Sequence, residues 1–334
     1  MTTVSVIIPT RNYGRYLRQA VDSVRRQTWT DWRCLIVDDG STDDTERIVK
    51  TFEVLDSRIA YLPLQPSGLS AARNAGLLAT DGDFVQFLDA DDFIGPAKIE
   101  RQLQLFFENP ATDIVYGDVR YFRDGATADT VPSADRWIEM PPLAGPSGTG
   151  ESVVPTLLQD NIMAVQSPLI RRAILDRVEG FAVGLRGMED WECWLRCALS
   201  GAAFVRDGCT DPEALSYVRL HGGSMSQDQI AMLEAALTVR QRIQPLLTTE
   251  ALRRLNQLRS HQQLADLGIL EGLGGHPGRG IRYLLKAGLS EQRPKWLAWA
   301  LLVPILRQPA GRRVLERWRR RQAGESSTIA KRRA

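Results

Sequence analysis

The sequence predicts an α/β protein with a mostly parallel sheet flanked by helices, followed by a helical C-terminal extension. Within residues 1–120, short apolar runs rich in β-branched residues alternate with segments whose apolar residues recur at helical spacing. Strands that alternate with helices in this way pair in parallel through right-handed crossovers. Acidic or polar residues directly follow several runs, at the strand ends where such sheets bind ligands.

The first three elements are expected to form a β-α-β unit. Residues 4–8 are a short apolar run typical of a buried strand, and residues 34–37 repeat this pattern. Between them, four apolar residues lie three or four positions apart and therefore share one face of a helix: Leu17, Ala20, Val21 and Val24.

The same alternation continues to residue 119. Apolar positions at helical spacing predict helices at 48–55 and 69–79. Proline is favoured at the first position of a helix, so Pro96 is expected to open the next one. Strands are predicted at 58–62, 84–88 and 114–119.

Beyond these elements the pattern changes. Residues 124–152 are rich in Gly, Pro and polar residues, which is typical of a functional loop or lid. A helix is expected to open at Glu189–Asp190. The predicted organisation is a first domain at 1–225, a helical extension at 226–292 and an apolar and basic tail at 293–334.

Composition limits the classes of protein that fit. A chain of 334 residues with 43% hydrophobic content is long and apolar enough for a large folded core. The N-terminus lacks an apolar signal segment and the four cysteines contain no CxxC pair, so a reducing cytoplasm is expected. Cys193 and Cys197 are one helical turn apart; they fit buried packing, with a shared metal as the alternative.

The small net charge of +2 conceals an asymmetry. Residues 293–334 carry 12 basic and 2 acidic side chains. The apolar stretch 296–306 is too short to span a bilayer, and an arginine-rich segment follows it. Two interpretations stay open: peripheral attachment to the anionic inner face of the cytoplasmic membrane, or packing on the protein's own body with a solvated basic face. A nucleic-acid partner is not expected, because no recognised binding motif accompanies the basic run.

Two acidic clusters follow predicted strands. Asp38–Asp39 comes after the strand at 34–37, and Asp89–Ala90–Asp91 after the strand at 84–88. Either cluster alone suits an ordinary turn. Together at one sheet edge, they offer the oxygen ligands that Mg²⁺ or Mn²⁺ takes beside a substrate diphosphate.

The chain resembles the family 2 glycosyltransferases, whose fold is the Rossmann-like GT-A fold. Seven stretches carry the resemblance in the order that the family shows, and they span about two thirds of the chain. The last includes the departure Val218, which separates Tyr217 from Arg219. The stretches are 4–12 (VSVIIPTRN), 37–43 (VDDGSTD), 68–76 (GLSAARNAG), 87–92 (FLDADD, with its DxD motif), 180–181, 189–191 and 217–221.

The resemblance implies a role for each matching residue in binding the donor. Asp39 accepts from the nucleotide base, or in the alternative interpretation only caps a turn. Arg73 approaches the nucleotide or diphosphate, or is only an exposed helical arginine. The remaining implied donor contacts are Pro9, Thr10, Asn12, Asp89, Glu189 and Arg219, and the implied metal ligands are Asp91, Asp89 and His221.

Asp190 is the predicted general base. In the implied reaction its carboxylate removes the proton of an acceptor hydroxyl as that oxygen attacks the anomeric carbon. A single displacement inverts the anomeric configuration, and a divalent cation offsets the charge of the leaving diphosphate. The predicted activity is transfer from a nucleotide sugar, expected to be a UDP-sugar, to a glycan or lipid-linked acceptor in cell-surface polysaccharide synthesis.

The sequence fits two other classes of protein less well. A sugar nucleotidyltransferase needs a Gly-rich, basic phosphate loop after the first strand, which residues 9–14 do not supply. An inactive nucleotide-sugar or glycan binding module of the same fold is the alternative, although such a module is expected to have lost one of the acidic motifs.

Overall fold

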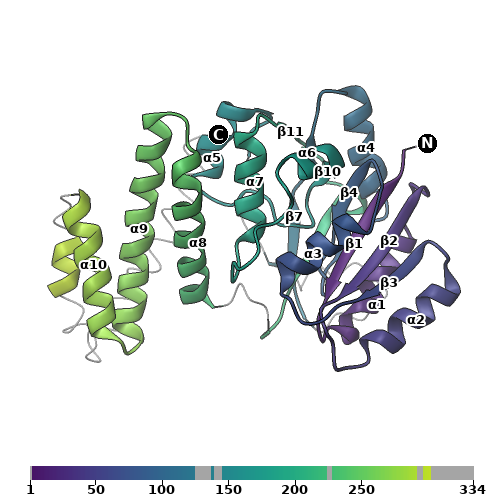
Figure 1. Ribbon diagram of the computed structural model, residues 1–334, viewed down its shortest axis with the longest axis horizontal. Coiled ribbons are helices and arrows are strands. Elements are labelled where there is room, and N and C mark those ends of the chain that lie inside the picture. Colours follow the sequence, from purple (N-terminus) through teal and green to yellow (C-terminus); the bar gives the residue numbers. More distant parts are fainter. Residues whose placement is uncertain (1, 125–136, 139–144, 224–227, 292–295, 302–334) are drawn as a thin grey trace. The chain divides into compact units, whose positions relative to one another are not determined.

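The computed structural model describes residues 2–124, 137–138, 145–223, 228–291 and 296–301 (Figure 1). The chain divides into two compact units, residues 1–227 and 228–334. The first contains two sheets and their helices, and the second is helical.

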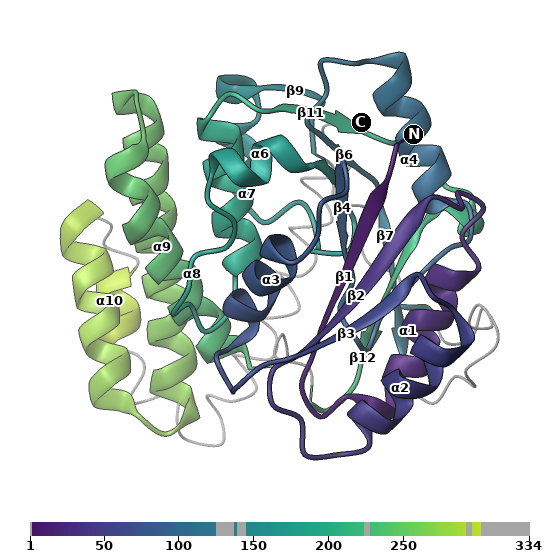
Figure 2. The same cartoon turned by 45° about the vertical axis from the view of Figure 1, so that its right-hand side comes forward.

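The central sheet of the first unit has eight strands, most of them parallel (Figure 2). Two strands, β10 and β9, run against the other six. The mostly parallel α/β sheet predicted from the sequence is confirmed. In spatial order the strands are β3 (Ile59–Pro63), β2 (Trp32–Asp38), β1 (Val4–Thr10), β4 (Phe84–Phe87), β10 (Leu169–Arg171), β6 (Ile114–Tyr116), β11 (Ala203–Arg206) and β9 (Gly148–Thr149).

Strand β1 lies between β2 and β4, and all seven of its residues are buried. Its alternate residues face opposite sides of the sheet. Val4, Val6 and Ile8 join the core cluster that also contains residues of helices α1, α2 and α4. Ile7 faces Gly76 of helix α3, where an added Cβ would lie 2.5 Å from the Ile7 side chain. These helices span Gly14–Arg25 (α1), Thr45–Leu55 (α2), Leu69–Leu78 (α3) and Lys98–Glu108 (α4).

The prediction of one continuous strand at 114–119 is wrong. Strand β6 ends at Tyr116, and β7 (Val119–Arg123) belongs to a second sheet. The break occurs because the main chain of Gly117 exchanges two hydrogen bonds with the Ser167 hydroxyl. The second sheet has the order β5 (Phe93–Ile94), β12 (Ser216–Leu220), β7 and β8 (Trp137–Ile138).

Pro96 does not open a helix as predicted, because α4 begins at Lys98. The amides of Gly95 and Ala97 instead donate to the carbonyls of Leu215 and Glu213, so residues 95–97 are hydrogen-bonded to the segment that leads into β12. Three more helices complete the first unit: α5 (Val154–Leu157), α6 (Arg172–Arg177) and α7 (Glu189–Leu199). The prediction that a helix opens at Glu189 is confirmed.

The second unit consists of α8 (Gln229–Ile243), α9 (Glu250–Gly274), α10 (Pro277–Glu291) and a helical segment at 296–301. Trp296 and Ala300 are buried in its core cluster with residues of α9 and α10. The first part of the predicted tail therefore packs inside the helical unit, while residues 302–334 lie outside the described residues. No described helix is long and apolar enough to cross a membrane.

Lys98 is buried in the first unit, and no carboxylate of the described residues lies at hydrogen-bond distance from its amine. Its Nζ donates to Gln86 Oε1 at 2.5 Å and to Gln102 Oε1 at 2.7 Å. Burial lowers the pKa of Lys98 to about 7, against a small opposing effect of Asp207. A neutral amine has two N–H donors, which match these two acceptors.

The depressed pKa of Lys98 predicts a stability that rises with pH. Between about pH 7 and about pH 10 the unfolded chain holds a proton on this amine that the folded chain has released. Relative to a Lys98→Met variant, we expect wild type to gain on the order of 2 kcal/mol between pH 7 and pH 9. Urea denaturation at each pH measures this. The exposed Lys50→Met is the control and should track wild type; parallel curves for Lys98→Met and wild type would contradict the prediction.

Candidate functional site

Polar residues gather where three neighbouring parallel strands end. Strands β2, β1 and β4 are adjacent and parallel, so Asp38, Thr10 and Asp89 follow or end them at the same edge. The sheet edge predicted from the sequence is therefore present in the fold. Pro9 lies within β1 opposite Val37 and is buried.

The first two loops at this edge are joined by Asn12. Its backbone has a positive φ of 61°, which asparagine tolerates better than most residues. Its side-chain oxygen accepts from the Thr42 amide at 2.7 Å, and its own amide donates to Ser41 Oγ at 2.8 Å. Asn12 therefore holds the loop after β1 to the loop after β2. Its predicted contact with the nucleotide-sugar donor stays a prediction.

Asp39 organises the segment that leads into α3. Its carboxylate accepts from the amides of Ser67, at 2.5 Å, and Gly68, at 3.0 Å. Gly68 has a positive φ of 93° directly before the helix, a conformation suited to glycine. Arg11 lies 3.7 Å from the same carboxylate. The turn-capping role is thus present, and the contact to a nucleotide base stays a prediction.

Arg73 lies at the centre of the site. This α3 side chain is only 1% exposed, so the alternative of an exposed helical arginine is wrong. One terminal nitrogen donates to Glu189 Oε1 at 2.5 Å and the other to Asp89 Oδ1 at 2.7 Å. The guanidinium also lies over the Phe181 ring. Arg73 thereby joins α3, the turn after β4 and the start of α7.

The charges of Arg73, Asp89 and Glu189 influence the pKa values of Arg73 and Asp89. Burial by itself would lower the pKa of Arg73, but Asp89 and Glu189 outweigh that effect and raise it. Loss of solvent around the Asp89 carboxyl, 31% of whose side chain is exposed, raises its pKa; Arg73 opposes the rise and Asp91 adds to it. The guanidinium therefore stays charged between its two carboxylates.

The acidic turn after β4 is held from the second sheet. Asp92 accepts from the Arg219 amide at 2.7 Å and from Gln166 Nε2 at 2.6 Å. Burial, followed by the charges of Asp91 and Asp89, raises the pKa of Asp92 well above its usual range. The Asp92 carboxylate is used by these two donors, and the N-cap position of the next helix, α4, is Ala97.

Arg219 fixes the same turn through its side chain. The guanidinium is buried, with Nε donating to the Asp91 carbonyl at 2.9 Å and the terminal nitrogens to Asp124 and Gln19. It also lies over the rings of Tyr16 and Phe122. These contacts give Arg219 a packing role, and its predicted contact with the donor stays a prediction.

Asp91 and His221 fit a divalent cation in their donor chemistry. Asp91 Oδ2 lies 2.9 Å from His221 Nε2, about the separation of neighbouring ligand atoms around a small cation with bonds of about 2.1 Å. No group of three His, Cys, Asp or Glu side chains among the described residues is placed to hold a metal. Two protein ligands with substrate phosphates in the other positions suit Mg²⁺.

The hydrogen bonds of His221 indicate its tautomer. Its Nδ1 accepts from the Gly223 amide at 3.1 Å, so a neutral ring carries its proton on Nε2 and donates it to Asp91. A cation at Nε2 competes with that proton. The rings of Tyr13 and Tyr16 flank the imidazole, with centroids 5.8 and 5.1 Å away.

Asp190 lies in the first turn of α7, next to Glu189. Its Oδ1 accepts from the Trp191 amide at 2.7 Å and its Oδ2 from Asn161 Nδ2 at 3.0 Å. Burial and then the Glu189 charge raise the pKa of Asp190 to about 7, against the lowering effects of Arg73 and the two hydrogen bonds. A carboxyl that titrates near neutral pH suits a general base.

Three buried polar atoms of this region have no hydrogen-bond partner among the described residues: Thr10 Oγ1, Ser70 Oγ and Arg73 Nε. Thr10 ends β1, and the other two lie on α3, which packs on β1. Buried polar groups normally find partners, so this edge is suited to a polar ligand. Ser70 was not singled out in the sequence, although it lies in the matching stretch 68–76.

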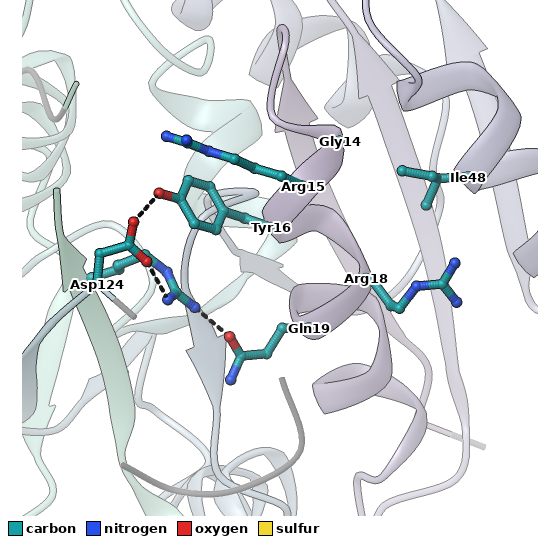
Figure 3. A pocket seen from close by; sticks show the side chains of 8 residues that line it. Gly14, Arg15, Tyr16, Arg18, Gln19, Ile48 and Asp124 are labelled. Atoms are coloured by element: carbon teal, nitrogen blue, oxygen red, sulfur yellow. Dashed lines mark hydrogen bonds and ion pairs between the residues drawn. The ribbon is translucent and has the colours of Figure 1, made fainter. Parts of the chain in front are cut away.

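A pocket of about 300 Å³ lies along α1 (Figure 3). Figure 3 shows the Tyr16 hydroxyl directed towards Asp124 in the pocket lining; it donates a hydrogen bond to Asp124 Oδ2, and the two oxygens are 2.5 Å apart. Of the predicted site residues, only Arg219 lines this pocket. The lining consists of Gly14, Arg15, Tyr16, Arg18, Gln19, Ile48, Asp124 and Arg219.

The fold is the GT-A fold, and comparison with known structures supports it. The match to the structure of S. aureus TarS 1–349 in complex with UDP-GlcNAc covers 96% of this chain and 92% of the TarS chain, with a TM-score of 0.61 and 19% identity. A mannosyltransferase from Pyrobaculum calidifontis, in complex with GDP-Man and Mn²⁺, covers 90% and 84%, with a TM-score of 0.58 and 15% identity.

Residues 5–169 match glycosyl transferase family 2, and the chain belongs to this family. It is 32% identical over 227 residues to an uncharacterized glycosyltransferase of Nostoc, covering 66% of each chain. It is 38% identical over 127 residues to the putative teichuronic acid biosynthesis glycosyltransferase TuaG of Bacillus subtilis, covering 38% of this chain and 50% of TuaG. The match thus spans only part of these relatives.

The Arg73 bridge predicts a large loss of stability when its cation is removed. Arg73→Met leaves Glu189 and Asp89 without their counter-charge, and removing one partner of a buried ion pair costs about 3–5 kcal/mol. Denaturant unfolding measures the loss. A triple variant that also carries Asp89→Asn and Glu189→Gln should recover part of it, because no unpaired charge is left. Wild-type stability in Arg73→Met would contradict this account.

Proposed function

We propose that this chain is an inverting glycosyltransferase. It moves a sugar from a nucleoside-diphosphate donor, a UDP-sugar, to a hydroxyl of a glycan or lipid-linked acceptor in cell-surface polysaccharide synthesis. The observation that carries the proposal is the Arg73 bridge, which joins the acidic turn to the helix that presents Asp190. Donor-side and base-side residues, more than 100 positions apart in the sequence, thereby share one sheet edge.

Asp190 acts as the base in this proposal. Its position in the first turn of α7 leaves lone pairs on both oxygens beyond the two hydrogen bonds that hold it. With a pKa of about 7 it is largely ionised just above neutral pH and can still accept a proton efficiently. Removing the proton of the acceptor hydroxyl makes that oxygen nucleophilic as it attacks the anomeric carbon from the face opposite the diphosphate.

The donor is held at the ends of β1 and β2 and at the start of α3. The unpartnered hydroxyls of Thr10 and Ser70 offer hydrogen bonds there, and the Asp39 carboxylate lies at the same edge. UDP-GlcNAc in the TarS complex and GDP-Man in the Pyrobaculum complex support a nucleotide-sugar donor. The name of TuaG supports a polysaccharide product.

Asp91 and His221 would hold a divalent cation, Mn²⁺ or Mg²⁺. When bound, the cation offsets the charge that develops on the leaving diphosphate. Asp89 is also a predicted metal ligand. Its Oδ1 accepts from Arg73, and its Oδ2 would be the atom that binds the cation. Arg219 and Asp92 keep the turn in place from behind.

Two variants test the assignment. Asp190→Asn preserves size but removes the base, and Asp91→Ala removes a cation ligand. We expect each to lower the transfer rate by about 100-fold or more, with little change in the thermal unfolding midpoint. The measurement is release of nucleoside diphosphate with Mn²⁺ from the donor that gives the largest thermal stabilisation in a panel of UDP-, GDP- and dTDP-sugars.

Asp44 is an exposed carboxylate in the same unit, so Asp44→Asn is the matched control and should keep full activity. Full activity in both site variants would exclude the proposed mechanism. Donor binding without any turnover in wild type would favour the binding-module alternative.

We also propose that the enzyme is cytoplasmic and that its basic C-terminus brings it to the inner face of the membrane, where a lipid-linked acceptor resides. The support is the excess of 12 basic over 2 acidic side chains in residues 293–334. Trp296 and Ala300 belong to the helical core, so the contacting segment begins after Leu301. Leu289 and Leu301 are exposed in the same unit.

A chain ending at Leu301 separates the two uses of this segment. We expect full-length protein to sediment with vesicles containing anionic lipid, and the shortened chain to lose most of this binding while its helical core stays folded. High salt should weaken the full-length binding because the attraction is electrostatic. Equal sedimentation of both chains would remove residues 302–334 from the proposal; neutral vesicles provide the control.

A further inference from the structure

The loop between α5 and β10 is attached to α7 at two points. Trp191 Nε1 donates to the Leu157 carbonyl at 2.7 Å, and Trp194 Nε1 donates to the Met163 carbonyl at 3.2 Å. Both indoles are fully buried. Residues three apart on a helix are neighbours on its surface, so one side of α7 holds the segment between Leu157, the last residue of α5, and Met163, in the middle of the loop. Asn161 lies between these attachment points.

The orientation of the Asn161 amide follows from its contacts. Its side-chain oxygen accepts from the Met163 amide at 3.3 Å, so its NH₂ group is directed the other way. That NH₂ group donates to Asp190 Oδ2 at 3.0 Å. The other oxygen of Asp190 accepts from the Trp191 amide. Both carboxylate oxygens are therefore held, one by α7 and one by the loop that α7 itself anchors.

We infer that Asn161 is a positioning residue for the transfer reaction: it orients the Asp190 carboxylate towards the acceptor hydroxyl and favours its ionised form. The inference rests on the proposed function, in which Asp190 is the base. It assigns a task to a residue outside every motif of the sequence analysis. A hydrogen bond to the charged form of a carboxylate is the interaction expected to have this effect.

Several charged or titratable groups surround Asp190. Glu189 on the same helix opposes its ionisation, and Arg73 on α3 favours it. Tyr121 on β7 and Asp160 in the loop also face this region, since Asp190 and Asp160 both contribute to a raised pKa of Tyr121, after burial and Asp92. Arg73 acts on Asp190 through its charge alone, whereas Asn161 acts through a direct hydrogen bond, so an Asn161 variant changes one contact.

The activity test uses the full chain, Mn²⁺ and the donor selected from the nucleotide-sugar panel. In Asn161→Ala the acid limb of the kcat–pH profile should move upward by about one pH unit, while the rate at pH 9 and the donor KM stay near wild type. Asn161→Asp, which is the same size but adds a carboxyl beside Asp190, should move the limb further. Asn109→Ala, an exposed asparagine at the end of α4, should leave the profile unchanged.

A second measurement does not depend on turnover. Because the pKa of Asp190 is raised in the folded chain, the contribution of this residue to stability, measured as wild type relative to Asp190→Asn, should fall as pH rises from about 4 to about 7. In Asn161→Ala this fall should continue to higher pH. In an Asp190→Asn background the substitution of Asn161 should no longer affect the pH dependence, because the group through which it acts is gone.

The outcomes separate the two hypotheses. If Asp190→Asn abolishes transfer but Asn161→Ala lowers the rate equally at every pH and leaves the pH dependence of stability unchanged, the positioning role is overturned. If Asp190→Asn retains full transfer, the proposed role of Asp190 as the base fails, and with it the positioning role of Asn161. A shifted acid limb together with the loss of coupling in the double variant supports the inference.

Discussion

The structure of the site depends on one buried cation. Arg73 lies between Asp89 and Glu189, and the three residues come from three different elements: α3, the turn after β4 and the start of α7. Burying three charged groups costs much solvation free energy, and this cost is offset only when the groups hold one another at hydrogen-bond distance. The same requirement fixes the distance between the edge that offers carboxylates to a donor diphosphate and the helix that presents Asp190.

Three acidic residues in the turn after β4 have different tasks because their neighbours differ. Asp89 faces Arg73, Asp91 faces His221, and Asp92 faces the amide of Arg219 and Gln166. Partners from α3, from β12 and the residue after it, and from the loop before β10 therefore allow these carboxyls to lie close together. Gln86, which accepts from buried Lys98, also donates to the Gln166 carbonyl at 3.0 Å and so supports this network. A catalytic edge of this kind needs an equally polar and well-satisfied layer beneath it.

The proposed chemistry follows from this division. A carboxyl next to Glu189, partly removed from water, has a pKa near neutrality, while Arg73 and two hydrogen bonds keep the ionised form accessible. The opposite side of the same edge has unpartnered hydroxyls and a carboxylate–histidine pair suited to a nucleotide and a cation. The helical second unit adds no residue to this edge in the proposal, and its basic end is assigned to the membrane instead.

The sequence by itself determined the alternation of strands and helices, the strand ends that meet at one edge, and the family, because these depend on local patterns and on motifs of adjacent residues. Tertiary structure alone decided that Gly117 breaks a strand, that Pro96 precedes its helix by two residues, and that Arg73 is buried. It also decided that Asn161 reaches Asp190. Each of these depends on partners between 16 and 120 positions away, and a hydrogen bond over such a distance leaves no periodic signal in the chain.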